Sequence, residues 1–98
     1  MEYRLEITLR ANLDIEQACE WIARRAPLAA ERWHLRLLEK MKTLTKNPDR
    51  YALAPESTRD REIRQFLYGK RRGIHRVLYA IEDDKVRILE VRHGARDF

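Results

Sequence analysis

Two helical segments joined by almost no linker constrain the fold of this chain more than any other feature. Apolar residues recur at helical spacing from residue 12 to 26 and again from residue 27 to about residue 46. Pro27 interrupts the first run and suits the first turn of a second helix, and Asn12 offers an N-cap for the first helix. Helices so closely connected are expected to pack as an antiparallel hairpin. The two apolar faces comprise Ile15, Ala18, Cys19, Ile22 and Ala26, and then Ala30, Trp33, Leu37, Met41 and Leu44.

Period-two alternation predicts strands before and after this hairpin. Residues 2–10 alternate between apolar and polar side chains, and strand-like runs follow at about 62–68, 73–81 and 85–93. Gly69 and Gly73 bracket a basic turn, and Asp83 and Asp84 give the last reversal the character of a hairpin. The order β-α-α-β-β-β predicts one α+β domain over residues 1–98, with a small sheet and the helical hairpin packed on one face.

The predicted strands carry apolar residues on both sides, so alternation alone leaves the inner face undecided. Strict alternation places Arg76 and His75 on opposite faces of one strand. In the next strand it puts Ile88 on the same face as Glu90 and Arg92. Part of the face away from the helices is therefore expected to be covered, which a partner protein could do. Residues 47–61 are rich in turn formers and are predicted to be a loop, long enough for so small a domain to suggest a functional role.

Positive charge is concentrated in one short stretch of the chain. The net charge is +5, and residues 59–76 contain 7 Lys and Arg residues against 2 Asp and Glu residues. Such a block attracts phosphates or an acidic protein; a solvated, solubilising face is the alternative explanation.

Other classes of protein and site are disfavoured by composition. The single cysteine, Cys19, allows no internal disulfide and argues against a metal cluster. It is expected to be a buried thiol on the first helix. Trp21 and Trp33 are expected to pack in the core or between helices. Because the sequence has no long apolar run and no signal-peptide pattern, we expect a cytoplasmic protein without a membrane partner, a cofactor or a metal.

The whole chain resembles the RelE/ParE superfamily of type II toxins. No single motif carries this resemblance; the order of several segments does. These are YRLEITLRA, CEWIARRAPLAAERWHLRLLEKMKTL, LAPE, EIRQFLYGK, HRVLYAIEDDKVRILEV and RHGARDF.

The resemblance implies a fold, a partner and two classes of target. The fold would be a small, twisted, mainly antiparallel four-stranded sheet with a helical hairpin. The partner would be a cognate antitoxin, acidic and partly disordered, that forms a hetero-oligomer with the toxin and blocks it. RelE-like members cut mRNA on the ribosome, whereas ParE-like members bind DNA gyrase without catalysis of their own.

A ribonuclease that works without metal must move protons and stabilise charge on the phosphate. By resemblance to RelE, Arg76, Arg96 and His93 are the candidate catalytic residues, and His75 is a second possible proton carrier. The candidate contacts to nucleic acid or another target are Arg64, Lys70, Arg71 and Arg72.

Two departures weaken the resemblance to a nuclease. RelE continues into a segment with a catalytic Tyr, which has no counterpart here before Phe98, and Glu62 stands at a position where RelE has a basic residue. Three alternatives therefore stay open: a ribosome-dependent endonuclease, a non-catalytic gyrase inhibitor, or a small basic nucleic-acid-binding module. Arg76 and Arg96 could also form ordinary ion pairs on the sheet surface, with Glu90, Glu82 or Asp97 as partners.

Overall fold

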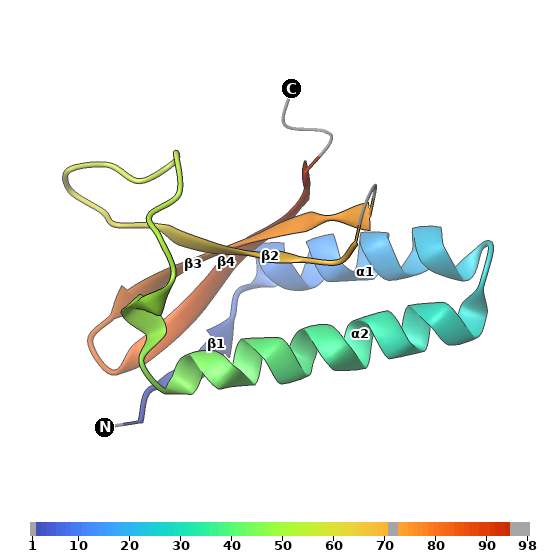
Figure 1. Cartoon of the computed structure of the whole chain (residues 1–98), viewed down its shortest axis with the longest axis horizontal. Coiled ribbons are helices and arrows are strands. Elements are labelled where there is room, and N and C mark those ends of the chain that lie inside the picture. The colour runs from blue at the N-terminus through green and yellow to red at the C-terminus, as the bar shows by residue number, and fades with distance from the viewer. Residues whose placement is uncertain (1, 71–72, 95–98) are drawn as a thin grey trace.

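A computed structural model describes residues 2–70 and 73–94 and confirms the predicted α+β fold (Figure 1). Its strands form one sheet in the order β1-β4-β3-β2, in which β1 is parallel to β4 and the other pairs are antiparallel. Helices α1 and α2 lie side by side on one face of this sheet. The elements are β1 (Arg4–Ile7), α1 (Leu9–Ala23), α2 (Pro27–Lys42), η1 (Thr43–Thr45), η2 (Pro48–Arg50), β2 (Arg64–Tyr68), β3 (His75–Glu82) and β4 (Lys85–His93).

Helix α1 begins earlier than the sequence indicated. Thr8 is its N-cap, and the Thr8 hydroxyl accepts a hydrogen bond from the Ala11 amide at 3.2 Å. The same hydroxyl donates to the Ile88 carbonyl of β4 at 2.8 Å, so it joins the helix start to the sheet. The prediction of Asn12 as the cap was wrong, because Thr8 can satisfy a helix amide and a strand carbonyl together. Leu9, expected at the end of the strand, is therefore helical.

The core lies between the helical hairpin and the inner face of the sheet. Pro27 occupies the first turn of α2, as predicted. The expected buried role of Trp21 was wrong, since 51% of this residue is exposed, whereas Trp33 packs against the core. Cys19 is half-buried, and this burial raises the pKa of its thiol. The buried core residues are Ala11, Ile15, Leu37, Met41, Leu44, Phe66, Val77, Tyr79, Val86, Ile88 and Val91.

A β-bulge decides which residues of β4 face the helices. The register between β3 and β4 shifts between Leu78 and Tyr79, where Leu78 pairs with Glu90 and Tyr79 pairs with Ile88. The extra residue in β4 turns both Ile88 and Val91 into the core. Strict alternation had grouped Ile88 with Glu90, and that grouping was wrong.

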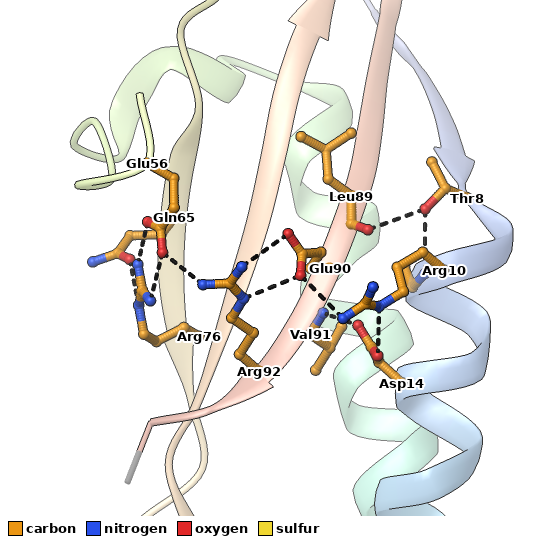
Figure 2. Close-up of polar contacts among 11 residues, drawn as sticks. Thr8, Arg10, Asp14, Glu56, Gln65, Arg76, Leu89, Glu90, Val91 and Arg92 are labelled. Carbon is orange, nitrogen blue, oxygen red and sulfur yellow. Dashed lines mark hydrogen bonds and ion pairs between the residues drawn. The ribbon is translucent and has the colours of Figure 1, made fainter. Parts of the chain in front are cut away.

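The other face of the sheet, here called the outer face, is partly covered by the chain itself. Leu78 and Ala80 are each 1% exposed in the isolated chain, so no partner is needed to bury them. The loop from residue 51 to 63 runs beside β2, to which it is joined by a bridge between Leu53 and Arg64. From this loop Glu56 reaches the outer face (Figure 2).

Candidate functional site

Arg76 lies on the outer face of β3, where its guanidinium is held by two neighbouring side chains (Figure 2). Its Nη1 and Nη2 atoms donate to the Glu56 carboxylate at 2.9 and 2.6 Å, and its Nε donates to Gln65 Oε1 at 2.8 Å. Only 14% of the Arg76 side chain is exposed. The bidentate bond from Arg76 is the main cause that lowers the pKa of Glu56, which stays ionised at neutral pH. Arg76 thus forms an ion pair, as expected, and a loop residue, Glu56, is one of its partners.

The Arg76–Glu56 pair is one end of a longer row of charges. Glu56 Oε2 also accepts from Arg92 Nη1 at 2.9 Å, and Arg92 in turn binds both oxygens of Glu90. Charges alternate in sign along the row, with three guanidinium groups and three carboxylates. We call this row the outer ladder; it comprises Gln65, Arg76, Glu56, Arg92, Glu90, Arg10 and Asp14.

The far end of the outer ladder joins the sheet to α1. Arg10 Nη2 lies 3.5 Å from a Glu90 oxygen, and Arg10 Nε donates to Asp14 Oδ1 at 3.2 Å. The other Asp14 oxygen accepts the Val91 amide of β4 at 2.9 Å. The ladder therefore ties together the loop, β3, β4 and α1, which makes it a structural element.

Arg64 lies on the inner side of β2, away from the outer ladder. It pairs with Tyr79 in the register of the sheet, and its Nη1 donates to the carbonyls of Asp49 and Tyr51 at 3.2 and 2.7 Å. Its side chain is 20% exposed. These bonds hold η2 and the residue after it against the sheet. Tyr79 donates to the Pro48 carbonyl in the same region, and burial raises its pKa to about 12.

His75, the first residue of β3, and His93, the last residue of β4, form an aromatic stack on the inner face. The centres of their rings are 5.0 Å apart in an edge-to-face arrangement, and the His75 ring is 5.2 Å from that of Trp33 on α2. His75 is buried, and its Nδ1 lies 3.1 Å from the Gly73 carbonyl oxygen. Because neighbouring strand residues point to opposite faces, the inner position of His93 puts it across the sheet from Arg92 and its partner Arg76.

The structure thus separates the sequence-predicted catalytic residues that it describes. Arg76 belongs to the outer ladder, whereas His93 belongs to the aromatic stack on the inner face. Lys70 is exposed at the turn after β2, and it lines a groove whose lining includes neither Arg76 nor Arg64. The candidates Arg71, Arg72 and Arg96 lie outside the described residues.

An open groove of about 1050 Å³ runs between α1 and the ends of β3 and β4. Its walls include Trp21, Trp33, His75 and His93, with Lys70 at the turn between β2 and β3. The exposed Trp21 ring presents one face to the Arg25 guanidinium, at 4.9 Å. Indole and imidazole rings in an open groove can bind apolar or aromatic side chains of a peptide, and the lysine can bind a carboxylate.

Two kinds of site are not found among the described residues. Within residues 2–70 and 73–94, no group of three or more His, Cys, Asp or Glu side chains is placed to hold a metal ion. In the same part of the chain, no helix has the length and apolar character needed to cross a membrane.

Two features of these sites could not be predicted from the sequence. Glu56 is one acidic residue in an irregular loop, and nothing periodic marks it as the partner of Arg76. Trp21 is next to Ile22 on a helix. It is exposed because the helix turns another side toward the sheet, and the sequence alone does not determine that side.

Comparison with known proteins places the chain beside one group of toxins. Residues 5–98 match a family model described as the ParE toxin of the type II toxin–antitoxin system parDE. A solved structure titled "Chromosomal ParDE TA system from P. aeruginosa" is similar in fold, with a TM-score of 0.75. The two chains share 16% sequence identity, and the likeness covers 94% of this chain and 96% of that one. No curated protein matches the sequence.

Proposed function

The chain belongs to the ParE toxin family of type II toxin–antitoxin systems, and from this we propose that it inhibits growth until a cognate antitoxin binds and neutralises it. The two form a hetero-oligomer in the cytoplasm. The family match over residues 5–98 is the observation that carries the proposal. The exposed groove supports it, because a small domain that leaves two tryptophans in an open groove has a surface suited to a partner protein.

The groove is the part of the surface that we assign to the antitoxin. Apolar side chains of an antitoxin helix would pack on Trp21 and Trp33, and an acidic side chain would reach Lys70. An acidic segment that is disordered when free would become ordered on binding, which couples its folding to the neutralisation of the toxin. The cationic stretch from residue 59 to 76 favours such a partner through long-range attraction.

For the target, we favour non-catalytic inhibition of DNA gyrase over cleavage of mRNA. A nuclease that used Arg76 and His93 together would need both side chains at one phosphate, and they lie on opposite faces of the sheet. In addition, Arg76 donates hydrogen bonds to Glu56 and Gln65, and Arg64 donates to main-chain carbonyls. The alternative of a small basic nucleic-acid-binding module would need no antitoxin at all.

Growth on expression tests the proposal. Expression of the chain alone should stop growth, and co-expression of the antitoxin should restore it. A chain that leaves growth unchanged, although it is folded and abundant, would contradict a toxin. Growth arrest that the antitoxin does not relieve would contradict neutralisation by this partner.

The target is tested separately with purified components. Inhibition of DNA supercoiling by gyrase, reversed by the antitoxin, is the expected result. A chain that binds DNA or RNA with similar affinity with or without gyrase, and does not slow supercoiling, would favour the nucleic-acid-binding module.

A further inference from the structure

Helix α2 carries three cations that form no ion pair with any other residue that the structure describes; they are Arg32, Arg36 and Lys40. In the basic stretch of the sequence, by contrast, Arg61 and Arg76 are each held by a carboxylate. Arg32 and Arg36 are exposed, and Lys40 is half-buried. We call these three residues the cationic row, and we propose that the row binds the phosphate backbone of a nucleic acid.

The residues of the cationic row are spaced four apart, so they follow one ridge of the helix. At a rise of about 1.5 Å per residue, Arg32 and Lys40 are separated by about 12 Å along the helix axis. A DNA duplex carries one phosphate for about each 1.7 Å of its axis, which gives about 7 phosphates over that length. The row can therefore contact several phosphates at once.

The cationic row lies along the β2 edge of the sheet. Lys40 Nζ donates to the Leu67 carbonyl at 3.1 Å, which uses one of the three donors of the amine. Burial raises the pKa of the Tyr68 hydroxyl, and the nearby charge of Arg36 opposes this rise. The row therefore follows β2 from Leu67 to Tyr68, toward the turn in which Lys70 can supply a fourth cation.

The make-up of this surface favours a nucleic acid over an acidic protein. A protein interface has a core of apolar and aromatic side chains that is poor in charge, whereas contacts to a nucleic-acid backbone are made by cations and other polar groups. The middle of the cationic row is Arg36. The exposed Leu28 lies on the same ridge but one turn before Arg32, and the exposed Leu35 points about 100° away from Arg36 around the helix.

The acidic residues of α2 do not cancel this positive charge. Glu31 directly precedes Arg32, so it points about 100° away from it. Glu39 acts on the Tyr68 hydroxyl together with Arg36, which places one carboxylate beside the row. Because the row has three cations, positive charge prevails even with this neighbour. The row lines no part of the groove assigned to the antitoxin, and the proposal does not depend on the function proposed above.

The experiment measures how salt weakens the binding of the full-length chain to a short, fluorescently labelled DNA duplex. Each phosphate contact contributes about −0.9 to the slope of the logarithm of the binding constant against that of the salt concentration. Three contacts predict a slope of about −2.7. Replacing Arg32 and Arg36 together by glutamine should make the slope shallower by about 1.8 and weaken binding in about 50 mM salt at least about tenfold.

Lys42→Gln is the matched control for Arg36→Gln, because each removes one exposed cation from α2 and introduces a good helix former. Lys42 comes two residues after Lys40, so its side chain points to the other side of the helix. Arg36→Gln should make the slope shallower by about 0.9, and Lys42→Gln should leave it unchanged. In NMR spectra of the wild type, the Nε–Hε signals of Arg32 and Arg36 should move when the duplex is added.

A single-stranded RNA forms a second arm of the experiment, with an expected slope of about −0.7 per contact. If the duplex and the single strand both bind, and both lose affinity in the double variant, the row recognises the backbone in either form. If only one of them binds in this way, that form supplies the phosphates.

Two results would overturn the proposal. One is a folded double variant whose slope and affinity equal those of the wild type. The other is that neither nucleic acid binds in about 50 mM salt, while polyglutamate does bind and loses affinity in the double variant; the surface would then take an acidic protein. Because the measurement contains neither gyrase nor antitoxin, either result leaves the proposed toxin function to its own tests.

Discussion

The structural role of the Arg76–Glu56 pair can be tested by its effect on stability. Arg76→Ala removes the three hydrogen bonds to Glu56 and Gln65 and leaves the Glu56 carboxylate with Arg92 as its remaining partner in the outer ladder. Breaking a fully buried ion pair costs about 3–5 kcal/mol, and breaking an exposed one costs about 0.2–1 kcal/mol. The Arg76 and Glu56 side chains are 14% and 27% exposed, so we expect a loss of about 2–3 kcal/mol in the free energy of unfolding.

A double-mutant cycle separates the pair from its surroundings. Urea unfolding of Arg76→Ala, Glu56→Gln and the double variant should give a coupling energy of about 1–2 kcal/mol. The Arg4–Asp84 pair is the control, since its side chains are 69% and 50% exposed at a separation of 3.2 Å, and its coupling should stay below about 0.5 kcal/mol. Equal coupling energies for the two pairs would refute the structural role of Arg76.

The remaining predictions concern the cap, the pH dependence and the groove. Thr8→Ala should lower the free energy of unfolding by about 1–2 kcal/mol, whereas Asn12→Ala should change it by less than about 0.5 kcal/mol, as measured by urea unfolding; equal effects would contradict the cap. The pKa of Glu56 is lowered in the folded chain from its ordinary value of 4.5, so Glu56 stabilises the fold above that pH and loses this contribution as the pH falls through the folded value. Melting temperatures of Glu56→Gln should therefore fall less steeply with acid than those of the wild type; parallel curves would count against this. Trp21→Ala should weaken antitoxin binding in calorimetry at least about tenfold, with Leu53→Ala as an exposed control outside the groove, and unchanged affinity would exclude Trp21 from the interface.

The fold was largely predictable because its main determinants are local. The break at Pro27 set the helical hairpin, and the bounds predicted for the last strand, 85–93, agree with β4. Asp83, with a φ of +56°, makes the last reversal with Asp84, as their position indicated. The start of α1 was missed because the bond from Thr8 to the Ile88 carbonyl joins residues far apart in the sequence.

The arrangement of charges was less predictable, because it depends on tertiary contacts. Alternation correctly put Arg76 and His75 on opposite sides of their strand. It failed in the next strand, where the bulge reverses the pattern between Ile88 and Val91. That Glu56 would bind Arg76 could not be foreseen, since it depends on the path of a loop with no periodic pattern.

The most direct test of a toxin that does not cut RNA is the mapping of RNA 5′ ends in cells that express the chain without its antitoxin. We predict that growth stops while the 5′ ends of mRNA match those of control cells. New ends at codon boundaries, lost when His93 is replaced by alanine, would contradict this and would establish a nuclease.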